Sequence, residues 1–259
     1  MRLRFWKMTG AGNDFVLLAG LPKGRTGHAL ARVLCDRRFG VGADGLLVLS
    51  RNKKAVRLDY WNADGSAAFC GNGSRCAALW AAEHGWVRGK SFVLASNRGP
   101  LQVVLTGKGR AQVKMPSPHS LVLGKRLALN GKKLAVHYVD TGVPHAVVFV
   151  NDITKTNVKE LGKALRFHKA FGKNGANVDF VQFKAGVAHL RTYERGVEDE
   201  TLACGTGVVA AAFVARALGL AGSPVAVKVR GGATLTVSFD DGARLEGPGL
   251  TVYSGETTI

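Results

Sequence analysis

Two cysteine residues stand in matching glycine-rich motifs, because Cys-Gly-x-Gly occurs at residues 70–73 and again at residues 204–207. Alanine-rich apolar runs follow both motifs and predict helices over residues 74–83 and 208–218. Each cysteine therefore stands at a predicted helix N-terminus, where unpaired backbone N–H groups and the helix dipole favour an anion. Because such a setting lowers the pKa of a thiol below about 8.5, the pattern predicts a reactive thiolate at both places.

Paired thiols have a specific chemical use, because one can remove a proton from a carbon while the other supplies a proton to the opposite face. This exchange inverts a stereocentre, and it requires that one cysteine is a thiolate and the other a thiol. The Cα–H of an amino acid is a very weak acid, so the site must also stabilise a carbanion-like transition state. Backbone N–H groups at two helix N-termini can do this by holding the α-carboxylate.

The two motifs belong to a longer internal duplication. Gly12 precedes Gly142 by 130 residues, and Cys70 precedes Cys204 by 134, with Tyr60 and Tyr193 and two Gly-Ala-Asx segments at intermediate spacing. Chance matching of turns among 34 glycines is the alternative. We interpret the pattern as two copies of one domain of about 120–130 residues, an ordinary domain size. The expected boundaries are residues 1–117, joined by a tail at about 254–259, and residues 118–253.

Alternating apolar and polar residues predict many short strands around the two alanine-rich helices. The predicted strands cover residues 3–7, 45–50, 56–61, 91–96, 101–106, 136–139, 146–150, 178–183, 188–193, 225–230, 233–239 and 243–246. Weaker helical patterns cover residues 26–36 and 158–167. The expected fold class is α+β: two pseudo-symmetric domains, each a mixed or antiparallel, barrel-like sheet wrapped around a central helix.

Composition narrows the classes of function. The net charge of +18 makes a basic nucleic-acid-binding protein the competing class. However, the basic residues are scattered, and no zinc-finger or RNP-like pattern accompanies them, so we expect no specific nucleic-acid partner. No apolar run is long enough to span a membrane or form a signal-peptide core, and we expect no membrane partner. Four cysteines without a disulfide pattern predict a reducing, cytoplasmic location.

Five segments together resemble the diaminopimelate epimerase family: residues 7–16 (KMTGAGNDFV), 62–66 (NADGS), 70–76 (CGNGSRC), 193–196 (YERG) and 203–207 (ACGTG). The resemblance implies an isomerase that interconverts LL- and meso-diaminopimelate, precursors of lysine and peptidoglycan. It implies catalysis by two cysteines without pyridoxal phosphate or any other cofactor, and without a metal. It also implies an active site in the interdomain cleft and a small-molecule substrate. A homodimer is compatible with the resemblance, which does not decide the oligomeric state.

The same resemblance assigns roles to individual residues. Cys70 and Cys204 match the two catalytic acid–base residues, and His145 and Glu194 match residues that support catalysis. The matched substrate-binding positions are Asn13, Asn62, Gly71, Asn72, Gly73, Asn177, Glu194, Arg195, Gly205, Thr206 and Gly207.

The chemistry of the substrate agrees with these assignments, because its distal end is a second zwitterion. Glu194 can accept from an ammonium group, and Arg195 can bind a carboxylate in bidentate fashion. Taken without the resemblance, the Glu–Arg pair is typical of an exposed strand, the asparagines are typical of turns, and His145 is typical of a structural histidine.

One position departs from the family pattern. Val143 stands in Gly-Val-Pro-His where the family commonly carries asparagine, so a side-chain contact to substrate is absent or replaced, with Thr141 as a nearby candidate. The competing enzyme class is a two-thiol racemase of proline or 4-hydroxyproline. Cys35 and Cys76 are expected to be small buried residues, and the spacing of the cysteines argues against zinc.

Overall fold

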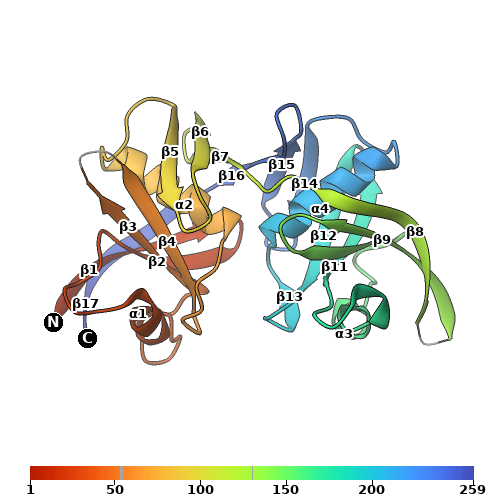
Figure 1. Ribbon diagram of the computed structural model, residues 1–259, viewed down its shortest axis with the longest axis horizontal. Helices are drawn as coiled ribbons and strands as arrows, with labels where there is room; N and C mark the ends of the chain where they lie inside the picture. The colour runs from red at the N-terminus through yellow and green to blue at the C-terminus, as the bar shows by residue number, and fades with distance from the viewer. Residues whose placement is uncertain (53–54, 130) are drawn as a thin grey trace. The chain divides into compact units, whose positions relative to one another are not determined.

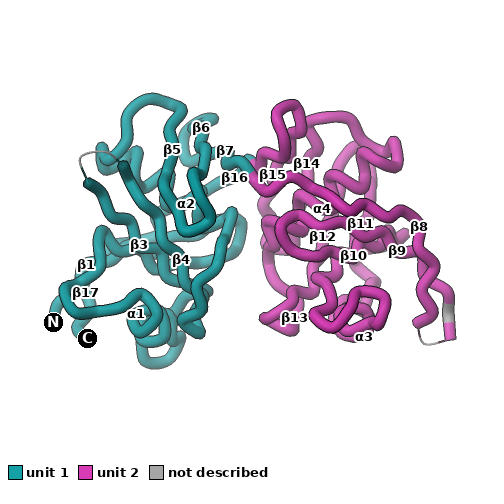
Figure 2. The backbone as a smooth tube through the Cα atoms, viewed as in Figure 1, with its two compact units in different colours: residues 1–114, 246–259 teal, residues 115–245 magenta. Residues whose placement is uncertain are grey.

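The computed structural model describes residues 1–52, 55–129 and 131–259. Its backbone divides into two compact units (Figure 2), the first formed by residues 1–114 with 246–259, and the second by residues 115–245. Within these residues each unit contains a sheet and two α-helices, of which one is central and buried.

The first unit is a mostly antiparallel sheet with strand order β17, β1, β2, β3, β4, β5, β6, β7. The β2–β3 and β4–β5 pairs are parallel, and β16, which brings the chain back into this unit, pairs with β7. The elements are β1 (Arg2–Gly10), β2 (Asn13–Leu18), α1 (Gly27–Leu34), β3 (Gly45–Arg51), β4 (Val56–Asn62), α2 (Gly71–Glu83), β5 (Ser91–Ser96), β6 (Leu101–Gly107), β7 (Arg110–Lys114), β16 (Arg244–Pro248) and β17 (Leu250–Thr258).

The second unit repeats this plan with strand order β8, β9, β10, β11, β12, β14, β15. The β10–β11 and β12–β14 pairs are parallel, as are their counterparts in the first unit, and β13 pairs with β12. The elements are β8 (His119–Leu129), β9 (Lys132–Asp140), β10 (Pro144–Phe149), α3 (Val158–Arg166), a 3-10 helix (Lys169–Phe171), β11 (Asn177–Lys184), β12 (Val187–Glu194), β13 (Asp199–Thr201), α4 (Gly205–Ala217), β14 (Val225–Val229) and β15 (Thr234–Ser238).

The repeated order of strands and helices confirms the predicted α+β duplication. In Figure 1, α2 lies among the strands of the first unit and α4 among those of the second. Over the described residues each sheet curls around its helix without forming a closed barrel. Gly249 lies between the end of β16 and the start of β17.

Small residues allow each sheet to approach its central helix. A Cβ atom added at Gly73 would lie 2.9 Å from Leu47 Cδ2, and one added at Gly207 would lie 2.5 Å from Asp179 Oδ1. Most residues of α2 and α4 are buried. Close packing of this kind holds the N-terminus of each helix at a defined place in its unit.

Candidate active site

Cys70 is the N-cap residue of α2 and is half-buried. Its backbone is extended, and its Sγ atom accepts a hydrogen bond from the Gly73 N–H group at 3.4 Å. The Ser74 hydroxyl donates to the Cys70 carbonyl oxygen at 2.9 Å and fixes the entry to the helix. The structure therefore directs a helix N-terminal N–H group at this sulfur, as the sequence predicted, and the glycines begin the helix three residues before the alanine-rich run.

Two predicted substrate-binding asparagines meet beside this helix. Asn72 is buried in the first turn of α2, and its Nδ2 group donates to Asn13 Oδ1 at 2.6 Å. Asn13 begins β2 and donates through its own Nδ2 group to Asp44 Oδ2 at 2.9 Å. Asn62 is occupied separately, since it accepts from the Tyr60 hydroxyl at 2.8 Å and donates to Ser66 Oγ at 2.9 Å.

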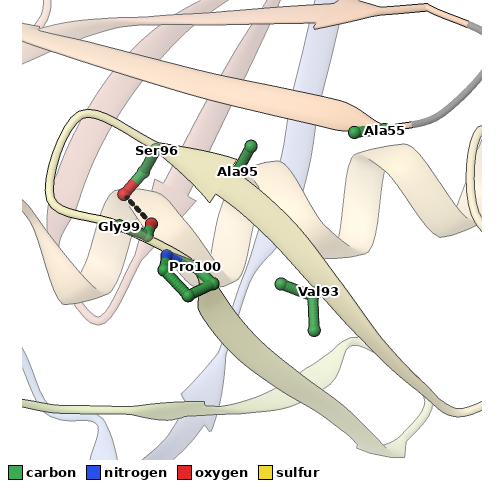
Figure 3. Close-up of a pocket in the computed structure, with 6 residues that line it drawn as sticks. All are labelled: Ala55, Val93, Ala95, Ser96, Gly99 and Pro100. Carbon is green, nitrogen blue, oxygen red and sulfur yellow. Dashed lines mark hydrogen bonds between the residues drawn. The ribbon is translucent and has the colours of Figure 1, made fainter.

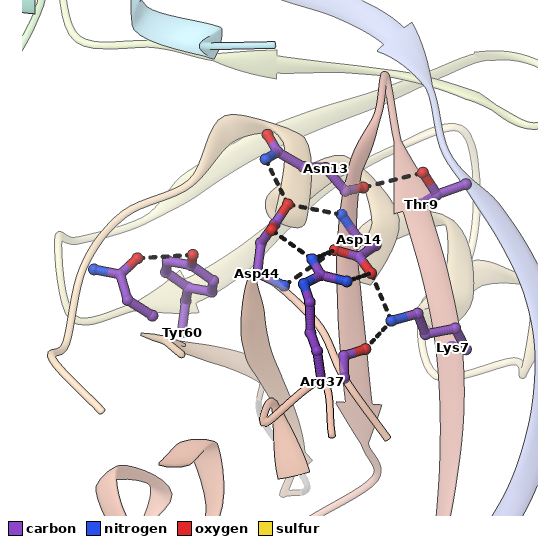
Figure 4. Close-up of polar contacts among 9 residues, drawn as sticks. Lys7, Thr9, Asn13, Asp14, Arg37, Asp44 and Tyr60 are labelled. Carbon is purple, nitrogen blue, oxygen red and sulfur yellow. Dashed lines mark hydrogen bonds and ion pairs between the residues drawn. The ribbon is translucent and has the colours of Figure 1, made fainter. Parts of the chain in front are cut away.

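A cluster of charged side chains supports Asn13 (Figure 4). Arg37 donates to both carboxylate oxygens of Asp14, at 2.7 and 3.0 Å, and to Asp44 Oδ1 at 2.8 Å. Lys7 Nζ lies 2.7 Å from Asp14 Oδ2. Burial raises the pKa of Asp14, but the hydrogen bonds from Arg37 and Lys7 outweigh burial and lower the pKa to about 2. Sequence reasoning missed this cluster because its members are distant in the chain.

Cys204 is the N-cap residue of α4 and is only 5% exposed. Its Sγ atom lies 3.3 Å from Thr206 Oγ1. Burial raises the pKa of Cys204 well above its ordinary value, and the negative charges of Glu194 and Asp179 raise it further. The predicted lowering of the pKa is therefore wrong for Cys204, because burial and two acids outweigh the helix N-terminus.

His145 lies beside this second helix N-terminus as half of a buried pair. Its Nδ1 atom is 2.7 Å from Asp179 Oδ2, and both side chains are fully buried. Thr192 donates to the other Asp179 oxygen at 2.7 Å, so the carboxylate has a partner at each oxygen. The sequence prediction missed Asp179, although strand periodicity places it on the same face of β11 as Asn177.

The remaining predicted residues of the second unit are linked by hydrogen bonds. Asn177 donates to the Pro144 carbonyl at 3.1 Å and accepts from the Arg195 backbone N–H at 2.9 Å. Glu194 accepts from the Thr201 hydroxyl at 2.9 Å. The Arg195 side chain is half-buried, and no carboxylate of the described residues forms an ion pair with it. Its guanidinium is therefore able to bind an anionic group of a ligand.

Val143 lies half-buried in the turn before β10. Its carbonyl oxygen accepts from the Thr141 N–H at 3.1 Å, and the Thr141 hydroxyl donates to the Thr206 carbonyl at 3.2 Å. The Thr141 hydroxyl proton is therefore already donated within the second unit, to the first turn of α4 at Thr206.

Other parts of the molecule carry less chemistry. Cys35 and Cys76 are buried, as predicted, and burial raises the pKa of each to about 12. Among the described residues there is no group of three or more His, Cys, Asp or Glu side chains that could hold a metal ion. No helix in the described part of the chain is both long and apolar enough to cross a membrane.

A pocket on the first unit has no acid–base side chain (Figure 3). Its lining consists of small and apolar residues at the ends of β4, β5 and β6: Ala55, Val93, Ala95, Ser96, Gly99 and Pro100. Proton transfer therefore has no candidate group there.

Comparison with known proteins identifies relatives over nearly the whole chain. A family model described as diaminopimelate epimerase matches residues 5–121 and 137–259. The diaminopimelate epimerase of Chlorobaculum tepidum is 40% identical over 266 residues, covering 97% of this chain and 100% of that protein. The diaminopimelate epimerase of Aquifex aeolicus is 38% identical over 271 residues, covering 98% of this chain and 97% of that protein.

Solved structures with the same fold are more distant in sequence. A Bacillus anthracis phenazine biosynthesis protein of the PhzF family has a TM-score of 0.77 at 16% identity and covers 100% of both chains. A probable proline racemase from Agrobacterium radiobacter has a TM-score of 0.74 at 17% identity, covering 99% of this chain and 92% of that one. These likenesses show the fold alone.

Proposed function

The chain belongs to the diaminopimelate epimerase family, and we propose that it interconverts LL- and meso-diaminopimelate by proton transfer at one α-carbon. The observation that carries this proposal is the duplicated helix N-terminus. Each unit presents a cysteine as the N-cap of its buried central helix, at the same point in the repeated order of strands. Two such groups are what inversion by two bases requires.

The proposed proton transfer uses the two thiols in opposite protonation states. Because the pKa of Cys204 is raised, Cys204 is the thiol, and Cys70 acts as the thiolate. Cys70 removes the α-proton from one face, and Cys204 delivers its own proton to the other face. Cys204 is then the thiolate and Cys70 the thiol, so the reverse reaction begins from the state that the forward reaction leaves.

The helix N-termini would stabilise the carbanion-like transition state. In this proposal the α-carboxylate accepts hydrogen bonds from backbone N–H groups in the first turns of α2 and α4, at residues 71–73 and 205–207. Charge that develops on the carboxylate in the transition state is then met by donors already in place. No cofactor enters the proposed mechanism.

Side chains around each cysteine would hold the rest of the substrate. Asn13, Asn62 and Asn177 supply amides, and Glu194 with Arg195 supplies opposite charges for the distal zwitterion. The half-buried Arg195 guanidinium supports this role, because it has no ion-pair partner in the described residues. The His145–Asp179 pair and Glu194 would influence the acid–base behaviour of Cys204. The free thiols accord with a reducing cytoplasm.

Incubation with LL-diaminopimelate in deuterated water tests the proposal. We expect meso-diaminopimelate to form without added cofactor and one α-position to gain deuterium, which mass spectrometry and NMR can follow. L-Proline and trans-4-hydroxy-L-proline, assayed in parallel, test the competing racemase activity. Inversion of proline without exchange into diaminopimelate would overturn the proposed substrate, and absence of exchange into either would overturn the reaction.

A further inference from the structure

Arg75 is a charged residue in an unusual place. It lies in α2, five residues after Cys70, and its side chain is fully buried. Within the described residues no carboxylate pairs with it; its contacts are Asn72 Oδ1 at 2.6 Å and the carbonyl oxygens of Gly71 and Pro248, each at 3.5 Å. Burial lowers the pKa of Arg75 to about 10, so the side chain is still charged at neutral pH.

This arrangement opposes stability in two ways. A buried guanidinium without a carboxylate partner carries a desolvation cost, which the proposed Cys70 thiolate offsets only in part, and a cation near a helix N-terminus is repelled by the helix dipole. The second unit shows that packing does not require arginine at this point. Val209 stands five residues after Cys204 in α4 and is fully buried.

The hydrogen bonds of Arg75 determine the orientation of Asn72. A guanidinium can only donate, so Asn72 must turn its Oδ1 atom toward Arg75 and its Nδ2 group away. That Nδ2 group donates to Asn13 Oδ1 at 2.6 Å. The Nδ2 group of Asn13 must then face away from Asn72.

Asp44 closes this chain of hydrogen bonds at its other end. A carboxylate can only accept, and Asp44 Oδ2 accepts from Asn13 Nδ2 at 2.9 Å. Asp44 is itself held by Arg37 at 2.8 Å and by the backbone N–H of Asp14 at 3.2 Å (Figure 4). With a donor-only group at one end and an acceptor-only group at the other, both amides between them have a single orientation.

We propose that Arg75 is a positioning residue for the epimerisation: acting through Asn72, it fixes the amide of Asn13 so that the second N–H of Asn13 is presented to a substrate carboxylate. The proposal rests on the proposed function, which places both asparagines on the substrate. It explains why a buried cation occurs in the Cys70 unit, whose helix carries Asn72 in its first turn, and why Val209 suffices in the other unit, whose helix carries Thr206 at the matching position.

Arg75→Met and Arg75→Lys separate positioning from stability. Arg75→Met removes a costly buried charge at similar length, so we expect Tm to stay the same or rise. We expect kcat/KM for LL-diaminopimelate to fall about 10- to 100-fold, as for loss of a charge-assisted hydrogen bond. Arg75→Lys keeps a donor-only cation and should recover part of the loss. Full activity in folded Arg75→Met would overturn the proposal.

A second readout does not depend on any substrate. In ¹⁵N-labelled protein, the side-chain amide signals of Asn72 and Asn13 should both shift in Arg75→Met, whereas those of Asn62, which belongs to a separate set of hydrogen bonds, should not. We call the series of hydrogen bonds from Arg75 through Asn72 and Asn13 to Asp44 the relay. If the Asn13 signals do not shift, the relay is wrong. If the wild-type chain does not epimerise diaminopimelate but both amides shift, the proposed function fails and the relay stands.

A double variant tests whether the two ends act on the same amides. Asp44→Asn alone should also lower kcat/KM, because asparagine can offer either a donor or an acceptor to Asn13. In Arg75→Met with Asp44→Asn, we expect a loss close to that of the more severe single variant. Losses that multiply would show independent sites and overturn the relay. If Arg75→Met does not fold, Arg75→Lys replaces it in the same comparison.

Discussion

The two helix N-termini of this molecule share a cysteine motif and a surrounding topology, yet their electrostatic surroundings are opposite. Beside Cys70 lies Arg75, a buried cation that has no carboxylate partner among the described residues. Burial raises the pKa of Cys204, and the negative charges of Glu194 and Asp179 beside it raise the pKa further. The two units share the backbone that presents each sulfur, while the charged side chains nearby differ: Arg75 lies on α2 itself, whereas Asp179 and Glu194 lie on strands β11 and β12.

This difference has a chemical consequence for a reaction that needs one thiol and one thiolate. Identical surroundings would give both cysteines the same tendency to ionise. Burial and, after it, the charges of Glu194 and Asp179 instead raise the pKa of Cys204, which favours its protonated form. The comparison between the two units therefore supports the proposal that Cys204 is the first proton donor, and substitutions that affect one unit at a time can test it.

The largest effect is expected from removing either cysteine. Cys70→Ala removes the base and Cys204→Ala removes the acid, and general acid–base groups typically contribute about 10² to 10⁴-fold to the rate. Both variants should therefore lose epimerisation by at least about 10²-fold when meso-diaminopimelate is measured by chromatography. Cys35→Ala is the matched control, since Cys35 is buried outside both motifs. Near-normal turnover by Cys70→Ala would contradict the two-base assignment.

The next effect compares one glycine in each unit. A Cβ at Gly207 would meet the buried, hydrogen-bonded Asp179 at 2.5 Å, whereas one at Gly73 would meet the end of the Leu47 side chain at 2.9 Å and the Phe15 ring at 3.3 Å. Overpacking against a fixed group should cost Gly207→Ala about 2 to 3 kcal/mol of unfolding free energy. Gly73→Ala should cost less, about 1 kcal/mol, because a shift of the Leu47 methyl group breaks no hydrogen bond. Urea denaturation measures both, and equal losses would show that the Asp179 pair is not rigid.

Much of this arrangement could be predicted from residue spacing. The cysteine motifs predicted the central helices, and constant separations predicted the duplication, because both depend on local pattern. Strands β2, β7, β8, β13 and β17 were not predicted; β8 and β17 were missed because most of their residues are exposed and do not alternate clearly. Charge placement was missed for a different reason. Residue type predicts that Arg75 is on the surface, and only the folded sheet shows that it is buried.

The same limit explains the error at Cys204. A helix N-terminus is a local feature that the sequence predicts, and by itself it lowers the pKa of a thiol. Burial and the approach of Asp179 arise from the strands packed around α4, and together with Glu194 they decide the direction of the shift. Asp179 is 25 residues from Cys204 in the chain, so no local rule connects them.

A smaller effect concerns pH and stability. The pKa of Cys204 is raised in the folded state, so this thiol contributes stability that is complete below the unfolded pKa of about 8.5 and is lost as pH rises above it. The expected loss is about 1.4 kcal/mol per pH unit for each such thiol. In Cys204→Ala the unfolding free energy should fall less steeply with pH between about 9 and 11. Cys35→Ala should make this fall less steep by an equal amount, since burial raises the pKa of Cys35 to about 12. An unchanged slope in Cys204→Ala would contradict the raised pKa.

The smallest effect is expected at Val143, where the second unit lacks an amide that the family commonly has. Thr141 does not replace that amide as a donor, because its hydroxyl proton is used on the Thr206 carbonyl. The backbone of the turn is already fixed by the hydrogen bond from Thr141 N–H to the Val143 carbonyl. Val143→Asn should therefore be tolerated, with kcat unchanged and KM altered by less than about threefold, which corresponds to well under 1 kcal/mol.

A substrate panel shows whether Val143 instead marks a different specificity. The panel contains LL-diaminopimelate, L-lysine, L-glutamate and L-proline, each assayed with the wild-type chain and with Val143→Asn. Both proteins should prefer diaminopimelate, because Glu194 and Arg195 provide opposite charges for a second zwitterion that the other three lack. If lysine or proline has the higher kcat/KM in the wild-type chain, the proposed substrate is wrong. The proposed inversion by Cys70 and Cys204 would be unaffected by that result. The two units would then differ in substrate recognition as well as in the charges around their cysteines.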